Sequence, residues 1–202
     1  PERMMRRPAS RANNASGAPP GRLRIVAGKW RGRRLPVADE PGLRPTSERI
    51  RETLFNWLAA TLEGARCLDL FAGSGALGFE ALSRGAGKVV FVESSARAVE
   101  ALKDSASLLE ASGAEIVRGD ALQFLQGEPQ RFDVVFLDPP FATDRLTDLC
   151  RLLDEADWLA DGARVYLEQD RHRPLPTMPA GWTISRDKTA GRVRYALAAT
   201  SN

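Results

Sequence analysis

The chain has 202 residues, of which 43% are hydrophobic and 27% are charged, with a formal net charge of +3. This length suits one domain with a proper core and some tail. No apolar run approaches the ~18 residues that a membrane span requires, and residues 1–24 lack the apolar core of a secretory signal. Two cysteines and one histidine cannot complete a four-ligand zinc site without carboxylates. We expect a cytoplasmic monomer with no metal and no membrane partner.

The charge is distributed unevenly along the chain. Residues 1–51 carry 13 Lys and Arg against 4 Asp and Glu, a net of +9, whereas residues 52–202 have a net of −6. A basic N-terminal part joined to an acidic body favours a polyanionic partner such as RNA. We divide the chain into a disordered basic tail (1–21), a basic β-hairpin with its linker (22–45) and the main domain (46–202).

The first predicted element is the basic hairpin. Arg24–Gly28 and Arg33–Val37 read as two short strands around a turn. The segment between them places an aromatic ring among several cations, an arrangement that suits the stacked bases and phosphates of a nucleic acid. The predicted RNA-binding residues of this segment are Lys29, Trp30, Arg31, Arg33 and Arg34.

The main domain alternates strand and helix patterns. A helix is predicted from Ser47 to about Leu62, with Thr46 as its N-cap. The strands that follow are predicted at Arg66–Leu70, Lys88–Glu93, Glu115–Arg118, Phe132–Asp138 and Ala163–Glu168. The helices between them are predicted at Ala76–Arg84, Ser95–Ser112, Ala121–Gln126 and Arg145–Glu155. This repetition predicts an α/β fold with a doubly wound, mostly parallel sheet.

The chain ends with two more predicted strands. Trp182–Lys188 and Arg192–Ala198 are separated by the short segment Thr189–Gly191. A short connection that contains glycine predicts an antiparallel hairpin. We therefore expect an antiparallel end to the sheet.

A glycine loop follows the first strand of the main domain. Gly73, Gly75 and Gly78 have the spacing G-x-G-x-x-G, and Glu93 ends the next strand. The glycines allow a ligand to approach bare backbone, and a carboxylate at Glu93 can accept hydrogen bonds from both ribose hydroxyls. The pattern predicts an adenosine-containing cofactor, with a tight βα turn and a solvated Glu93 as the alternative.

Asp69 bears on the choice between a nicotinamide dinucleotide and S-adenosylmethionine. A carboxylate just before the glycines would face a pyrophosphate unfavourably, but it could pair with the amino group of a methionine moiety. Asp120, after the third strand, gives an acceptor for the adenine edge or simply caps the next helix. We predict S-adenosylmethionine, bound by Asp69, Phe71, Ala72, Gly73, Gly75, Glu93, Ser94, Asp120 and Ala121.

The segment Asp138-Pro139-Pro140-Phe141 comes directly after a buried strand. Neither proline has an N–H to continue the sheet, so their carbonyls remain as acceptors beside the Asp138 carboxylate. Phe141 can stack on a flat ring, and ligands of open α/β sheets bind at the carboxyl ends of strands. The four residues predict a catalytic clamp for a planar base that carries an exocyclic amino group; the alternative is a plain strand end.

These motifs together resemble a known family. Asp69–Gly75 and Asp138–Phe141 are similar to class I S-adenosylmethionine-dependent methyltransferases that act on exocyclic amino groups. With Gly28–Gly32, Arg44–Asn56 and Ala72–Arg84 included, the chain resembles the RsmD family, the bacterial 16S ribosomal RNA guanine-N2 methyltransferases.

The resemblance runs from about Leu23 to Leu197. It implies methyl transfer to a guanine N2 in the 16S rRNA of the small ribosomal subunit, without a covalent enzyme intermediate. Hydrogen bonds to Asp138 and the Pro139 carbonyl would aim the nitrogen lone pair at the methyl group, and Asp138 could take the proton. Family members approach the cofactor or substrate at the positions of Thr46 and Arg44, which we add to the cofactor and RNA residues respectively.

Three other functions remain open on the sequence alone. The same chemistry could act on DNA adenine or a protein glutamine, although a DNA enzyme usually needs a separate target-recognition region. A nicotinamide-dependent oxidoreductase would leave Asp138–Phe141 unexplained. A non-catalytic RNA-binding protein would leave the intact motifs unexplained.

Overall fold

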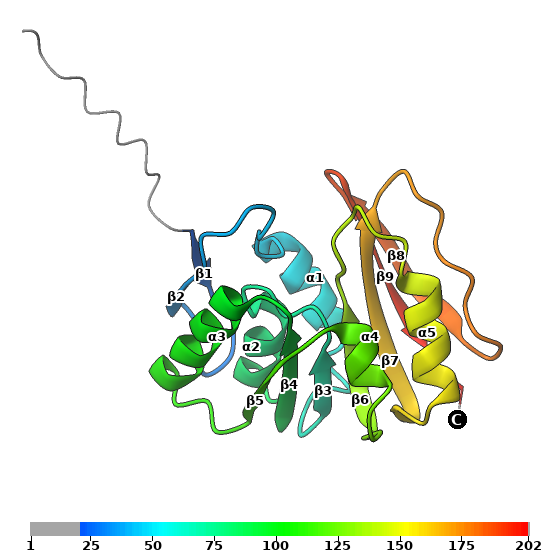
Figure 1. Ribbon diagram of the computed structural model, residues 1–202, viewed down its shortest axis with the longest axis horizontal. Coiled ribbons are helices and arrows are strands. Elements are labelled where there is room, and N and C mark those ends of the chain that lie inside the picture. Colours follow the sequence, from blue (N-terminus) through cyan, green and yellow to red (C-terminus); the bar gives the residue numbers. More distant parts are fainter. Residues whose placement is uncertain (1–20, 202) are drawn as a thin grey trace, which may run out of the picture.

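The computed structural model describes residues 21–201, so nearly all of the predicted basic tail lies outside the described residues. The helices are α1 Glu48–Trp57, α2 Ala76–Ser83, α3 Ala96–Leu108, α4 Ala121–Leu125 and α5 Leu146–Glu155. The strands are β1 Arg22–Arg24, β2 Arg34–Pro36, β3 Arg66–Asp69, β4 Lys88–Glu93, β5 Ala114–Arg118, β6 Phe132–Leu137, β7 Leu159–Asp170, β8 Thr183–Ala190 and β9 Val193–Ala199. Figure 1 shows their arrangement.

The main sheet has seven strands in the order β5-β4-β3-β6-β7-β9-β8. The first five strands in this order, from β5 to β7, are parallel to one another, whereas β9 is antiparallel to both β7 and β8. The predicted doubly wound sheet with an antiparallel end is confirmed. The chain builds β3, β4 and β5 outward and then returns to place β6 beside β3, so the switch point between β3 and β6 is where a ligand site is expected.

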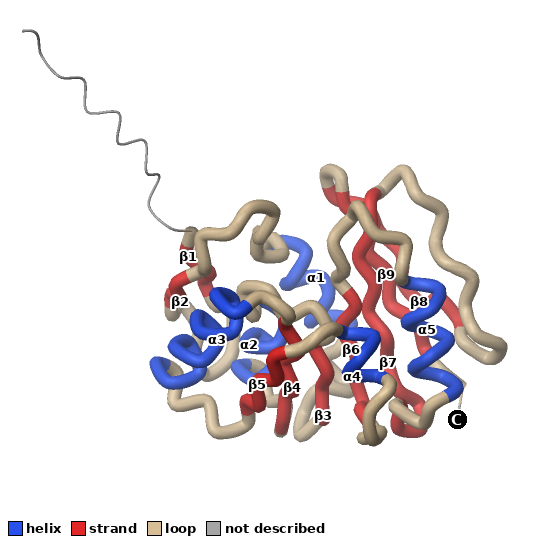
Figure 2. Tube along the Cα trace, viewed as in Figure 1, coloured by secondary structure: helices blue, strands red, loops and turns tan. Residues whose placement is uncertain are grey.

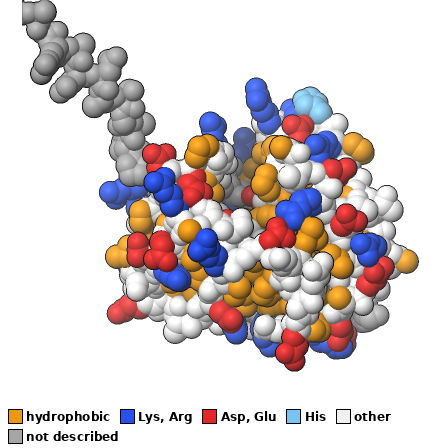
Figure 3. Space-filling model, in the orientation of Figure 1, with side chains coloured by type: hydrophobic (Ala, Val, Ile, Leu, Met, Phe, Trp, Pro, Cys, Tyr) orange, Lys and Arg blue, Asp and Glu red, His pale blue; other side chains and the backbone are white. Residues whose placement is uncertain are grey.

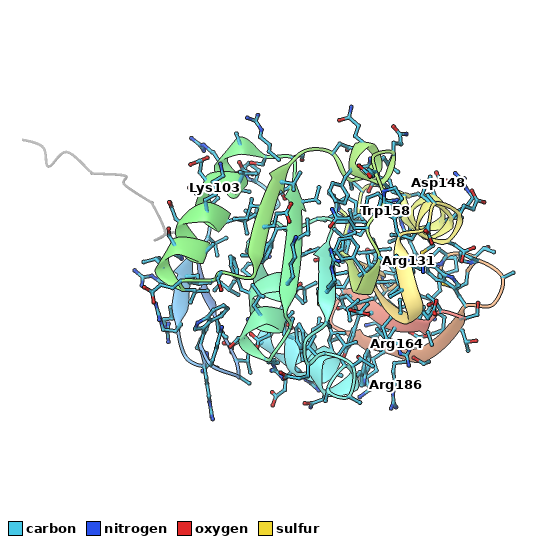
Figure 4. The ribbon with its side chains drawn as sticks, turned by 90° about the horizontal axis from the view of Figure 1, so that it is seen from below. Lys103, Arg131, Asp148, Trp158, Arg164 and Arg186 are labelled. Carbon is cyan, nitrogen blue, oxygen red and sulfur yellow. The ribbon has the colours of Figure 1, made fainter. Side chains whose placement is uncertain are left out.

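Helices cover both faces of the sheet (Figure 2). One buried cluster joins α1, α2 and the N-terminal hairpin to one face, and a second joins α4 and α5 to the other. Trp158 belongs to the second cluster and lies between α4 and α5 (Figure 4); its indole N–H donates to the Leu125 carbonyl at 3.1 Å. Because strands with helices on both faces are buried on both sides, their sequences are nearly continuous apolar runs.

The N-terminal hairpin forms as predicted but with shifted strands. Leu23 pairs with Leu35, and β1 ends at Arg24, where the sequence pattern predicted a start. The connecting loop packs on α2: Gly28 has φ +86°, and a Cβ there would lie 1.9 Å from the Ser83 carbonyl oxygen. The hairpin therefore shares the core of the main domain.

Four predicted boundaries were wrong. The N-cap of α1 is Ser47, whose hydroxyl accepts from the Ile50 N–H at 3.2 Å, and this helix ends at Trp57 rather than Leu62. The final hairpin turns at Gly191 and Arg192 instead of over residues 189–191. Strand β7 begins at Leu159, four residues before the predicted start at Ala163. Both Ser and Thr cap helices well, so composition alone could not choose between Thr46 and Ser47.

Candidate active site

Three neighbouring strands deliver carboxyl groups to one edge of the sheet. Asp69 is the last residue of β3, and Asp138 directly follows β6. Glu168 follows Leu167 of β7, which pairs with Leu137 of β6. Because β3, β6 and β7 are adjacent and parallel, their carboxyl ends meet at the upper edge of the molecule in Figure 1. The topology thus brings the predicted cofactor residue and the predicted catalytic residue together.

The Asp69 side chain is buried without a partner. It is 1% exposed, and neither carboxylate oxygen has a hydrogen-bond partner within residues 21–201. Burial raises the pKa of Asp69 to about 7 and outweighs the backbone N–H groups of Gly78 and Phe71, which act to lower it, while the nearby charges of Glu93 and Glu168 add to the rise. A buried polar group without a partner is costly and rare. A cationic ligand group would satisfy it, which fits the amino group of S-adenosylmethionine.

Backbone angles and close packing both favour glycine in this loop. Gly73 and Gly75 have φ of +52° and +83°, a region that favours glycine. A Cβ at Gly75 would lie 2.5 Å from the Phe79 ring, and one at Gly78 would lie 2.2 Å from the Phe91 ring. Gly78 therefore allows close helix–strand packing, while Gly73 and Gly75 shape the turn that a cofactor would approach.

Glu93 lies next to this loop. One carboxylate oxygen accepts from the Gly73 N–H at 3.0 Å, and the other accepts from the Ser95 N–H at 2.7 Å. A carboxylate has about four lone-pair directions, so two remain for ribose hydroxyls. Ser94, which follows Glu93, is exposed at the same edge.

Asp120 caps α4, as its alternative role predicted. Its Oδ1 accepts from the Leu122 N–H at 2.9 Å, and Arg145 forms an ion pair with it at 3.2 Å. Burial acts to raise the pKa of Asp120, but hydrogen bonds from Arg145 and from the α4 backbone lower it overall. The Arg145 guanidinium also lies 5.9 Å from the centre of the Phe71 ring. Ala121 is buried beside them.

Asp138 contacts groups from two other segments. The Thr46 hydroxyl donates to its Oδ2 at 3.4 Å, so Thr46 is placed at the clamp and not at the helix cap. Burial raises the pKa of Asp138 well above its usual range, and the neighbouring carboxyl of Glu168 adds to the rise. The pKa of Glu168 is also raised, mainly by burial. Two neighbouring carboxyl groups titrate as a pair. The pair retains one proton to a higher pH than an isolated carboxyl group would.

A cleft of about 360 Å³ opens beside the clamp. Pro139, Pro140 and Phe141 line one wall, and Phe141 is 37% exposed. The loop after β7 forms the other wall, where Arg173 donates to the Thr143 carbonyl at 3.2 Å and so links the two walls. This volume lies within the range of small-ligand sites.

The predicted RNA-binding cations are exposed, but Trp30 is not. The side chains of Lys29, Arg31, Arg33 and Arg34 are exposed on the hairpin, and Arg44 is exposed on the linker. Figure 3 shows Lys and Arg side chains on both sides of the hollow at the upper edge of the molecule.

The stacking role predicted for Trp30 is corrected by its burial. Its side chain is 8% exposed and belongs to the core cluster of the hairpin. The Lys29 ammonium lies 4.5 Å from the ring centre, and the backbone N–H of Trp30 donates to the Ser83 hydroxyl at 3.0 Å. The ring therefore packs in the core that joins the hairpin to the main domain. Because it is buried, it has no open face on which a base could stack.

Sequence reasoning missed three residues of this site. Glu168 and Tyr166 lie on β7, and Arg145 precedes α5. The available signal was a charged residue at the carboxyl end of an otherwise apolar run, as with Asp69. Within residues 21–201 no cluster of side chains is suited to a metal, and no helix is both long and apolar enough to cross a bilayer.

The sheet and its ligand edge define the class of protein. A glycine loop after β3, an acid after β4 and the Asp138–Phe141 clamp after β6 are the arrangement of a class I methyltransferase fold. The family model described as Conserved hypothetical protein 95 matches residues 23–199, and the chain belongs to that family. The resemblance to the RsmD family is confirmed by its relatives.

Two relatives and one solved structure illustrate the similarity. Ribosomal RNA small subunit methyltransferase D of Escherichia coli strain K12 is 47% identical over 184 residues, covering 91% of this chain and 92% of the relative. The protein of the same name from Haemophilus influenzae strain Rd is 48% identical over 182 residues, covering 88% and 93%. The solved structure of Escherichia coli yhhF has a TM-score of 0.84 at 44% identity, covering 90% of this chain and 99% of that one.

Proposed function

We propose that this protein transfers a methyl group from S-adenosylmethionine to the exocyclic N2 amino group of a guanine in the 16S rRNA of the bacterial small ribosomal subunit. The observation that carries the proposal is the placement of Asp138 near the buried carboxylate of Asp69, with a cleft of about 360 Å³ lined by the adjoining Pro139, Pro140 and Phe141. The names of the relatives support a ribosomal RNA of the small subunit as the substrate. Guanine N2 as the acceptor rests on the family resemblance and on the clamp.

The residues around β3 and β4 fit the cofactor. Bound S-adenosylmethionine would supply an electrophilic methyl group on a sulfonium centre. Asp69 would pair with the methionine ammonium, Gly73 and Gly75 would present bare backbone, and Glu93 would accept from the ribose hydroxyls. Asp120 and its neighbours would border the adenine.

The clamp would prepare the acceptor nitrogen. A guanine amino nitrogen is a poor nucleophile because its lone pair is delocalised into the ring. Accepting its two N–H bonds at Asp138 and the Pro139 carbonyl would shift the nitrogen toward tetrahedral geometry and aim the lone pair at the methyl carbon. Bound S-adenosylmethionine would supply the methyl group that this nitrogen accepts, and Asp138 would take the proton that the nitrogen releases. Phe141 would hold the base turned out of its stack.

The assay that tests this function measures tritiated methyl transfer to small subunits from a strain that lacks the gene. The labelled nucleotide is then mapped and the methylated nucleoside identified. We expect one labelled guanine carrying the methyl group on N2. Label on an adenine, or on ribosomal protein, would show that the acceptor is wrong.

The pKa of Asp69 gives the cofactor proposal a pH signature. A cationic ligand favours the ionised form, so affinity for S-adenosylhomocysteine should rise as pH increases through about 7. Asp69→Asn should lose this dependence and bind about tenfold more weakly at pH 8. Titration calorimetry at several pH values measures both effects. An unchanged affinity in the variant would remove Asp69 from the cofactor site.

The exposed cations of the hairpin should contact RNA phosphates. Reversing Arg31, Arg33 and Arg34 to glutamate should weaken binding to small subunits at least tenfold and flatten the dependence of log affinity on log salt concentration by up to about 3. Filter binding at several salt concentrations measures both quantities. Reversing Arg131 and Arg151, which are exposed away from the hairpin, serves as the control. Equal effects of the two sets would show that the hairpin has no specific role.

A further inference from the structure

Glu168 is a buried carboxyl group beside the clamp to which the proposed reaction gives no task. It is 4% exposed, and the Tyr166 hydroxyl donates to its Oε1 at 2.6 Å. The β6–β7 register places it next to Asp138, and it lines the same 360 Å³ cleft as Pro139, Pro140 and Phe141. Its position is therefore fixed at the wall of the base site.

A purely structural role explains this residue poorly. Burying a carboxyl beside another carboxyl costs stability unless donors compensate. Within residues 21–201 Glu168 forms no ion pair with Lys or Arg. Its partners are the hydroxyl groups of Tyr166 and Thr46 and the carboxyl group of Asp138, and hydrogen bonds with them favour the charged form of Glu168. Asp69 on β3 is the third acid at this edge. A carboxyl acceptor is thus held at the wall of the cleft, where hydroxyl groups are its hydrogen-bond donors.

The edge of a guanine offers two adjacent donors to such a site. Its N1–H lies next to the 2-amino group, whereas adenine has an acceptor at N1. Neighbouring strands lie about 4.8 Å apart, so carboxyl oxygens at the ends of β6 and β7 can face the same base edge. With the amino group at Asp138, the N1–H would point along the edge toward β7.

We propose that Glu168 accepts a hydrogen bond from the N1–H of the acceptor guanine and thereby selects guanine over purines whose N1 is an acceptor. The inference rests on the proposed function and assigns a specificity-determining residue to it. The hydroxyl of Tyr166 positions Glu168 and occupies its other oxygen. An acceptor at N1 would face the carboxylate lone pairs and be rejected, because a buried polar group would then lack its partner.

The analogue 2-aminopurine removes this contact. It keeps the 2-amino group that is to be methylated, but it has an unprotonated N1 and also lacks the 6-oxo group, so the contact is assigned from the change in rate ratio that a Glu168 variant causes. Small subunits reconstituted from 16S rRNA that carries either guanine or 2-aminopurine at the mapped position therefore differ in the proposed hydrogen bond. For the wild type we expect single-turnover transfer to guanine to be faster on the order of a hundredfold.

Glu168→Gln should reverse part of this preference. Its amide keeps the size of the side chain but adds an N–H2 group that can donate to an unprotonated N1. We expect the guanine to 2-aminopurine rate ratio to fall at least tenfold, with affinity for S-adenosylhomocysteine unchanged. Tyr166→Phe, which frees Glu168 from its partner, should lower the ratio less. Asp187→Asn is the matched control: its carboxylate accepts from the Arg194 guanidinium at 2.7 Å outside the cleft, and the ratio should stay at the wild-type value.

The outcomes separate the two proposals. If wild type labels the guanine but Glu168→Gln slows both substrates equally, the contact with N1 is refuted and the methyltransferase function stands. The Tyr166→Phe ratio decides the matter if Glu168→Gln does not fold. If wild type leaves small subunits unlabelled, or labels another base, the proposed function fails and the role of Glu168 fails with it.

Discussion

Replacing Asp138 by alanine is expected to lower the rate of methyl transfer by about 10³-fold while affinity for S-adenosylhomocysteine stays within about twofold. The change removes the acceptor that would orient the amino group and take its proton. The hydrogen-bond partners of Asp138 are Thr46 and Glu168, and neither belongs to the glycine loop or to β4. Single-turnover transfer to small subunits and titration calorimetry measure the two quantities separately.

Asp138→Asn provides the control, because it keeps a carbonyl acceptor but cannot take a proton in the same way. We expect a smaller loss, about 10²-fold. A rate near that of the wild type for either variant would remove Asp138 from the mechanism.

Asp138→Asn should also stabilise the fold. The folded-state pKa of Asp138 is raised, so its ionised form costs stability at neutral pH. The variant should melt a few degrees higher at pH 8, and the difference should shrink as pH falls below about 3, where the carboxyl is protonated in both the folded and the unfolded state. Higher stability with lost activity is the pattern expected for a strained catalytic group.

The sheet could be predicted from the sequence because its information is local. Buried parallel strands such as Lys88–Glu93 read as continuous apolar runs, and helices alternate with them. The site edge was predicted for the same reason, since Asp69, Glu93 and Asp138 each end or follow a strand. The carboxyl ends of parallel strands meet at one edge whatever their order in the sheet.

The rest of the site depends on contacts between distant segments. Glu168 becomes a neighbour of Asp138 only when β7 pairs with β6, and no local sequence pattern predicts that pairing. Thr46 acquires its contact with Asp138 because the neighbouring Ser47 takes the cap position. Trp30 looked like an exposed ring among cations, but its indole is large enough to fill the space over α2 while Lys29 reaches solvent.

Replacing Glu80 by alanine is expected to cost about 3–5 kcal/mol of stability. Glu80 is 0% exposed and accepts from the Arg51 guanidinium at 3.1 Å and the Arg84 guanidinium at 2.9 Å. It also accepts from the backbone N–H groups of Val26 and Ala27 at 3.0 Å. Burial lowers the pKa of Arg51, yet without Glu80 that 2% exposed guanidinium would remain as an unpaired buried charge. Urea unfolding with a common m-value measures the loss.

The network predicts that this internal substitution also weakens RNA binding. Glu80 holds the chain between β1 and the basic loop, so Glu80→Ala should release the hairpin cations from their places without changing the surface charge. Glu48→Gln, in the exposed pair with Arg24, is the control and should cost under about 1 kcal/mol. The double variant Glu80→Leu with Arg51→Met should recover part of the stability. Replacing both members of a buried ion pair by apolar groups leaves no unpaired buried charge, whereas removing one member does. A Glu80→Ala loss below about 1 kcal/mol would mean that water or Arg84 compensates the charge and that the hairpin is held by its apolar contacts.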